Sequence, residues 1–116
     1  MGQGDRVAPE RGTGLFVSAF NTAAEFEPEF DRWLDTEHMP RLATVPGVNC
    51  ARWFKTPADS PGSSSHKYVA SYHLESPSVC ESTAWNKAWE SERMHEMRGR
   101  MQNVLLLLLR RYTSNA

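Results

Sequence analysis

Residues 104–109 read VLLLLL, an unbroken run of six apolar side chains near the end of the chain. The run is much shorter than the ~20 apolar residues that cross a bilayer, so it predicts a β-strand, which we extend over residues 104–112. Side chains alternate between the two faces of a strand, so both faces of this one are apolar. Such a pattern is typical of a strand that is buried on both sides.

The segments before this strand complete a known order of elements. Two amphipathic helical stretches, over residues 26–41 and 76–101, alternate with three β-rich stretches. The resulting order, β-α-β-β-α-β, is that of the split βαβ unit, an α+β ferredoxin-like sandwich with an antiparallel sheet and both helices on one face. The three earlier strands are predicted at residues 15–20, 48–54 and 67–74.

The helices of such a sandwich can cover only one face of the sheet, whereas the strand at residues 104–112 needs cover on both. A second copy of the same sheet is the simplest cover for the other face, because an exposed apolar face would exceed the patches that monomers tolerate. We therefore predict a homodimer in which two sheets pack face to face, a dimeric α+β barrel.

Local signals set the helix boundaries. In the first stretch, Pro40 disfavours the α conformation of Met39, so we predict that the helix ends or bends there. In the second stretch, Ser76-Pro77 is a helix-start signal, and breaks are predicted near Ser82 and Ser91. Residues 57–65 (PADSPGSSS) predict a flexible hairpin loop.

Composition excludes several classes of partner. The formal net charge is −1, which argues against a nucleic-acid binder, and no polybasic segment could hold an anionic membrane. Cys50 and Cys80 are too few for a disulfide scaffold and lack CxxC spacing.

Residues 1–13 lack the apolar core of a secretory signal and any usable periodicity. We predict a cytoplasmic protein with free thiols, with a disordered lead at residues 1–13 and one domain at residues 14–113.

Two stretches resemble a known family. Residues 30–41 (FDRWLDTEHMPR), followed by residues 45–48 (VPGV), resemble the F-x-x-W-x-x-x-E-H-x-P…V-P-G pattern of EthD-like dimeric α+β-barrel proteins. Residues 67–77 (KYVASYHLESP) resemble that group's third strand and second-helix start, so the resemblance covers roughly residues 14–112. The wider superfamily includes cofactor-free monooxygenases of aromatic polyketides, muconolactone-type isomerases, polyketide cyclases, decarboxylases and haem enzymes.

The resemblance also implies a site. In several relatives a cavity between helices and sheet holds the substrate, and the histidine of the E-H-x-P segment faces it, which makes His38 the first catalytic candidate. Imidazole titrates near neutral pH and suits proton transfer, and Asp35 could orient the ring. The alternative is a structural histidine that closes the helix, where a cation suits the helix dipole. Relatives often carry an aromatic residue at the position of Leu34.

Other candidates come from strand faces and aromatic content. Tyr68 and Tyr72 share a strand face and could donate hydrogen bonds to a ligand oxygen, so both are catalytic candidates; core packing with a satisfied hydroxyl is the alternative. His73 lies on the opposite face of that strand. Aromatic side chains could line a flat apolar pocket, although core packing is their default role. The predicted substrate-binding residues are Phe30, Trp33, Arg41, Trp85 and Trp89.

We predict no metal and no cofactor. His66 and His73 are seven residues apart on a strand and therefore point to opposite faces. The chain has no H-E-x-x-H, no G-x-S-x-G and no Gly-rich phosphate loop, which argues against zinc hydrolysis, serine-nucleophile chemistry and nucleotide chemistry. A single histidine could still ligate a haem iron.

These observations favour a cofactor-free enzyme acting on a small, apolar, oxygen-bearing substrate with an aromatic or polyketide-like skeleton. The reaction would be proton transfer by a lyase, isomerase or cyclase, with His38 as general acid/base and Tyr68 or Tyr72 stabilising a developing enolate or phenolate. Two alternatives stay open. One is a cofactor-independent monooxygenase of a phenolic substrate, in which the substrate carbanion itself reacts with oxygen. The other is a non-catalytic, ligand-binding accessory protein.

Overall fold

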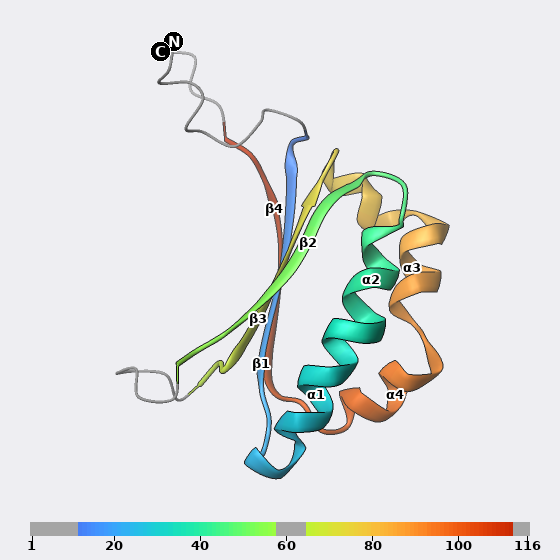
Figure 1. Ribbon diagram of the computed structural model, residues 1–116. Helices are drawn as coiled ribbons and strands as arrows, with labels where there is room; N and C mark the ends of the chain where they lie inside the picture. Colours follow the sequence, from blue (N-terminus) through green and yellow to red (C-terminus); the bar gives the residue numbers. More distant parts are fainter. Residues whose placement is uncertain (1–11, 58–64, 113–116) are drawn as a thin grey trace.

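A computed structural model describes residues 12–57 and 65–112, which form one four-stranded antiparallel sheet with helices packed against it. The strand order is β2-β3-β1-β4, so β2 and β4 are the edges. The described helices lie on one face of the sheet and leave the other face open (Figure 1). The predicted α+β, ferredoxin-like class and its element order are confirmed. The strands are β1 (Gly14–Asn21), β2 (Val48–Lys55), β3 (Tyr68–Leu74) and β4 (Gln102–Arg110).

The first helical region was predicted to end or bend at Pro40, and the structure shows that it does not end there. Its irregularity comes one turn earlier, where the chain makes a π-helical turn in which the Met39 N–H donates to the Leu34 carbonyl, five residues back. A proline lacks an N–H, and its ring crowds the carbonyl four residues earlier in a regular α-helix. The wider π turn relieves that conflict, so the helix continues through Pro40. The segments are a 3₁₀ turn (Ala24–Phe26), α1 (Glu27–Trp33), the π turn (Leu34–His38) and α2 (Met39–Ala43).

The second helical region breaks where the sequence predicted. The Ser82 Oγ accepts a hydrogen bond from the Trp85 N–H at 3.1 Å, and the Ser91 Oγ accepts one from the Met94 N–H at 3.2 Å. Each serine therefore caps the helix that begins after it, satisfying an N–H that has no partner within the helix. The segments are a 3₁₀ turn (Pro77–Glu81), α3 (Thr83–Trp89) and α4 (Glu92–Arg98).

The pleat of β3 sorts its side chains as the sequence predicted. Tyr68 and Tyr72 face the helices and are buried, whereas His73 is exposed on the open face. The Tyr68 ring stacks on Phe20 of β1, with ring centroids 4.9 Å apart. The layer between sheet and helices is thus a largely aromatic core, and the candidate site lies within it.

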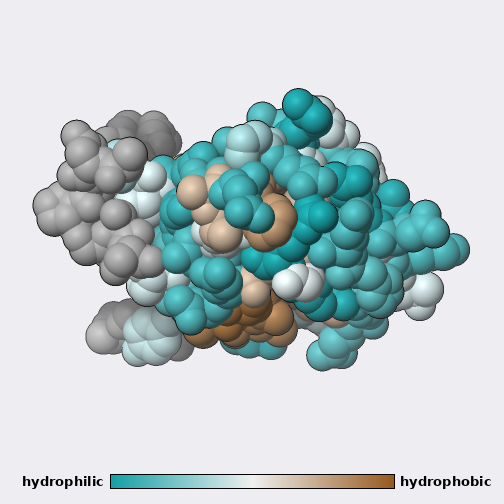
Figure 2. All heavy atoms as spheres, turned by 90° about the horizontal axis from the view of Figure 1, so that it is seen from below, coloured by the Kyte–Doolittle hydropathy of each residue, from teal (hydrophilic) through white to brown (hydrophobic). Residues whose placement is uncertain are grey.

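The β4 strand is exposed in the single chain. Side chains at residues 104–109 expose between 41% and 52% of their surface, so the burial predicted from the VLLLLL run is not reached within one chain. The physical reason is topological: β4 is an edge strand, and the described helices lie on one face of the sheet and leave its other face without cover (Figure 1). Figure 2 shows apolar atoms gathered in patches on an otherwise hydrophilic surface. The size of this exposed apolar strand is unusual for a monomer.

Some predictions fall on residues outside the described part. Residues 1–11 of the predicted disordered lead are outside the described part, and so is most of the loop predicted at residues 57–65. Thr13 is described, and its N–H donates to the Glu75 carbonyl at 2.9 Å while its carbonyl accepts from the Arg111 N–H at 2.7 Å. Among the described helices, none has the length and apolar character needed to cross a membrane.

Candidate functional site

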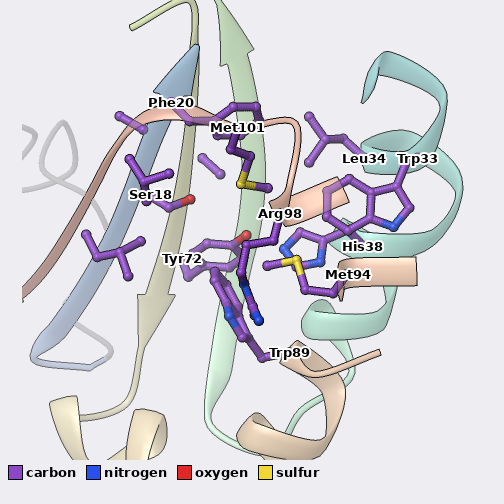
Figure 3. Close-up of a pocket in the computed structure, with 14 residues that line it drawn as sticks. Ser18, Phe20, Trp33, Leu34, His38, Tyr72, Trp89, Met94, Arg98 and Met101 are labelled. Atoms are coloured by element: carbon purple, nitrogen blue, oxygen red, sulfur yellow. The ribbon is translucent and has the colours of Figure 1, made fainter. Parts of the chain in front are cut away.

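An apolar cavity of about 430 Å³ lies between the helical layer and the sheet. Strands β1, β3 and β4 contribute to its lining, and so do the π turn, α3 and α4 (Figure 3). Few polar side chains reach it: Ser18, His38, Tyr72 and Arg98. The apolar lining consists of Ala19, Phe20, Trp33, Leu34, Ala70, Trp89, Met94, Met101, Val104 and Leu106. The cavity is of the size and character that small, mostly apolar ligands require.

His38 is the last residue of the π turn, and its side chain lines the cavity while only 4% exposed. The imidazole stacks on Trp33, with centroids 4.4 Å apart, and meets Trp89 edge to face at 5.1 Å. Its Nδ1 has no hydrogen-bond partner among the described residues. Burial, helped by the positive charge of Arg41, lowers the pKa of His38 to about 4. The ring is therefore neutral at pH 7, rather than titrating near neutrality as the sequence suggested.

Tyr72 is fully buried beside the same cavity. Its hydroxyl donates to the Met39 Sδ at 3.5 Å, a weak acceptor. Burial raises the pKa of Tyr72 above its ordinary value, and the nearby Ser18 hydroxyl acts in the opposite direction. The phenol therefore keeps its proton at neutral pH and could turn from the thioether to a stronger acceptor, such as a ligand oxygen.

Tyr68 does not share the cavity with Tyr72, although both lie on the same strand face. Its hydroxyl donates to the Asp31 Oδ1 at 2.7 Å and approaches the Glu27 carbonyl at 3.3 Å. The two tyrosines are four positions apart on β3, a separation of about 13 Å along the strand. Burial and the bond to Asp31 raise the pKa of Tyr68. These contacts fit the alternative interpretation, in which Tyr68 is a core residue with a satisfied hydroxyl.

Two of the five predicted substrate-binding residues lie at the cavity. Trp33 and Trp89 line it, but Phe30, Trp85 and Arg41 do not. Phe30 is fully buried between α1 and the sheet, with its ring 5.1 Å from that of Phe20. Trp85 packs edge to face on Tyr72 at 5.4 Å. The Arg41 Nε donates to the Ala88 carbonyl at 3.2 Å and so ties α2 to α3.

Arg98 is the main lining residue that the sequence did not indicate. It is the last residue of α4 and the only charged side chain in the lining as far as the described residues show. A signal was present, because Met94 and Met101, both in the lining, stand four residues before and three residues after it. In the helix predicted to run to residue 101, that spacing puts all three on one face, although α4 itself ends at Arg98.

A small irregularity shapes the β4 side of the cavity. Ala19 pairs with Leu105, and Asn21 pairs with Gln102, so two residues of β4 stand opposite Phe20. This β-bulge includes Asn103, whose φ of 54° lies in the left-handed region that asparagine tolerates. Val104, the second residue of the bulge, and Leu106 both line the cavity.

The described residues give little support to a metal ion. Nowhere in residues 12–57 and 65–112 do three His, Cys, Asp or Glu side chains come together in a way that could hold one. His38 is the one imidazole at the cavity, and it is confined by the two tryptophan rings. The absence of a cofactor stays a prediction.

Comparison with known proteins places the fold. No protein-family model and no curated protein matches the chain. A solution structure of an Arabidopsis thaliana protein is 12% identical and has a TM-score of 0.64, over 91% of this chain and 94% of that one. An ethyl tert-butyl ether d (EthD) family protein from Bacillus halodurans is 14% identical, with a TM-score of 0.51 over 82% and 95% of the two chains.

A third similar structure is that of the haem-degrading protein MhuD from Mycobacterium tuberculosis, which has two haems bound in its active site. It is 15% identical, with a TM-score of 0.51 over 89% of this chain and 99% of that one. The three likenesses confirm the ferredoxin-like fold and the resemblance to EthD-like proteins at the level of the fold. Identities this low carry no residue roles.

Proposed function

We propose that this chain is a cofactor-free enzyme that binds a small, apolar, oxygen-bearing aromatic or polyketide-like molecule and catalyses proton transfer on it, as a lyase, isomerase or cyclase. The observation that carries the proposal is the neutral imidazole of His38, which lines an apolar cavity together with the phenol of Tyr72. A base and a hydrogen-bond donor in an apolar site are what proton abstraction next to a carbonyl or phenol requires.

The pKa of His38 decides its part in the reaction. Because the resting ring is neutral, it must first act as a base, and it can act as an acid only after it has taken a proton from the substrate. Burial disfavours the isolated imidazolium, but an enolate or phenolate formed beside it would offset that cost by ion pairing. The enzyme would thus transfer a proton between two positions of one substrate.

Tyr72 supplies the complementary role. Its raised pKa keeps the phenol protonated, so it can donate a hydrogen bond to the oxygen on which negative charge develops. That bond strengthens as the charge grows, and it therefore favours the transition state over the bound substrate. Tyr68 has no such role in this proposal, because its hydroxyl is bound to Asp31 outside the cavity.

We also propose that the active form is a cytoplasmic homodimer. The open face of the sheet carries Leu15, Val17, Val69 and the odd-numbered leucines of β4, and nothing in the described single chain covers it. A second copy would bury this face, and β4 would then be covered on both sides, as the VLLLLL run predicts. The free thiols of Cys50 and Cys80 support a reducing compartment.

One observation favours the non-catalytic alternative. Neither His38 nor Tyr72, the ionisable groups on the inner wall of the cavity, has a pKa near 7, whereas an ideal general base titrates near the working pH. A ligand-binding accessory protein would have no need of such a base.

Hydrogen exchange separates the two functions without knowledge of the natural substrate. The probe is 1,3-dihydroxynaphthalene in deuterated buffer, whose ring proton between the two hydroxyls exchanges through a keto tautomer. We expect the protein to accelerate this exchange, as followed by proton NMR, and His38→Gln to slow it by about 10²–10⁴-fold. The matched control is His95→Gln on the exposed side of α4, which should retain the full rate. Binding without acceleration would support the accessory protein, and oxygen consumption would indicate the monooxygenase.

A further inference from the structure

We propose that Arg98 selects substrates that carry an acidic group, so that the ligand of this cavity is an aromatic or polyketide-like carboxylate whose anionic end lies at Arg98. The proposal rests on the proposed function of the cavity and adds the chemical class of its substrate.

The first argument is the place of the charge. Arg98 is the only charged side chain among the described residues that line the cavity, and the wall around it is made of tryptophan, methionine and leucine side chains (Figure 3). Its side chain is 42% exposed, so the guanidinium stands where the cavity meets solvent. A charge at this place keeps its hydration and can meet the polar end of a molecule whose apolar body lies deeper inside.

The second argument is the free hydrogen-bonding capacity of Arg98. Only its Nη2 is engaged, at 3.2 Å from each carboxylate oxygen of Glu90, while Nε and Nη1 have no partner among the described residues. The guanidinium fork binds a carboxylate best through two parallel N–H donors. Glu90 does not use this arrangement and is itself 48% exposed. Such a pair contributes little and can be exchanged for a better-placed anion.

The third argument is the contrast with the neighbouring arginines. Arg93 Nη2 lies 2.6 Å from the Glu29 Oε2 and also contacts Glu96, and Arg100 is paired with Glu29 as well. Neither of these two arginines lines the cavity. Arg98 alone among them faces the cavity and is weakly held, as expected for a side chain that changes partner on binding.

The polar groups of the cavity then define the shape of the ligand. An oxygen to be activated would lie at Tyr72 and His38 on the inner wall, the ring would lie against Trp89 and Met94, and the acid would lie at Arg98. The substrate therefore has two polar ends, a hydroxyl or carbonyl at one and a carboxylate at the other, separated by an apolar body. On binding, the ligand carboxylate replaces that of Glu90, so the net charge at the guanidinium does not change.

The test uses the full chain and three probes with one skeleton: 2-naphthol, 2-naphthoate and 6-hydroxy-2-naphthoate. Binding is followed by calorimetry and by quenching of tryptophan fluorescence, because Trp33 and Trp89 line the cavity. Arg98→Gln should weaken 2-naphthoate and 6-hydroxy-2-naphthoate about tenfold, as expected for a partly exposed, charge-assisted pair, and leave 2-naphthol within about twofold. Arg98→Lys should fall between, since it keeps the charge but loses the fork.

Two further variants make the result specific. Glu90→Gln removes the competing carboxylate and should tighten both naphthoates, whereas Arg93→Gln, which alters a nearby arginine outside the cavity, should change neither. Equal weakening of naphthoate binding by Arg98→Gln and Arg93→Gln would overturn the proposal, because the loss of affinity would then come from the lower positive charge of the surface and not from a contact with Arg98. Equal weakening of 2-naphthol and 2-naphthoate by Arg98→Gln would also overturn it, since Arg98 would then only shape the cavity.

The outcome is separable from that of the proposed function. If Arg98→Gln weakens only the naphthoates while His38→Gln leaves hydrogen exchange unchanged, the selection of acids stands and proton transfer fails. If hydrogen exchange depends on His38 but the wild-type chain binds the naphthoates no more tightly than Arg98→Gln does, proton transfer stands and the proposed acidic substrate fails. If none of the probes binds the wild-type chain at millimolar concentration, both proposals fail.

Discussion

Acid should destabilise this fold through His38. An unfolded histidine has a pKa of about 6.5, whereas burial lowers the pKa of His38 in the folded chain to about 4. Between these values the unfolded chain binds a proton that the folded chain refuses, so the free energy of unfolding falls as the pH falls. The contribution is complete above pH 6.5 and is lost as the pH falls through about 4.

The magnitude follows from the gap between the two pKa values. At about 1.4 kcal/mol for each pH unit, the gap corresponds to about 3.5 kcal/mol in full, of which about 3 kcal/mol is lost by pH 4. The side chain is only 4% exposed, so solvent screening does not reduce this value strongly. A loss of this size is a large fraction of the stability of a domain of this length.

The assay is urea unfolding at fixed protein concentration, at steps between pH 7.5 and pH 4. His38→Gln cannot gain the proton, so the wild-type chain should lose about 3 kcal/mol more than this variant across the range. The control is His95→Gln, which removes an exposed histidine from α4 and should leave the wild-type slope in place. Equal pH slopes for the wild-type chain and His38→Gln, or an NMR titration that gives His38 a pKa above 6, would refute the reasoning.

Three other predictions concern the surface, the site and the helices. The wild-type chain should have about twice its mass of 13.2 kDa in light scattering at micromolar concentration, and Leu107→Lys on the open face should yield a monomer; a wild-type monomer would contradict the face-to-face dimer. Tyr72→Phe should slow hydrogen exchange of the naphthalenediol about tenfold or more with little change in melting temperature, because the hydroxyl bonds only weakly to Met39; an unchanged rate would exclude its role. Ser91→Ala should cost about 1 kcal/mol in urea unfolding through the lost cap on the Met94 N–H, and no loss would show that water replaces the cap.

Local features of the chain were predictable because they depend on neighbouring residues. The alternation in residues 67–74 placed Tyr72 inside and His73 outside, since the period of a strand is two. The serines at residues 82 and 91 marked the helix breaks, because a hydroxyl before a helix caps its first N–H groups. Pro40 does not end the helix, which was one of the two outcomes predicted for it, because a π turn directly before it removes the conflict that a regular helix would have at a proline.

By itself the sequence determined the order of elements and the faces of the strands, and its resemblance to EthD-like proteins made His38 the first candidate for the site. Only the tertiary structure decided which of those inward-facing groups meet. The strand pattern places Tyr72 and Tyr68 on the same face, yet Tyr72 lines the cavity and the Tyr68 hydroxyl donates to Asp31. The difference arises because a different part of the helical layer packs against each tyrosine. Arg98 enters the lining from an element sixty residues after His38. The pKa of His38 likewise depends on how completely the two tryptophan rings and the sheet exclude water from the imidazole. Residues far apart in the sequence make these contacts, so the local sequence around His38 does not reveal the pKa.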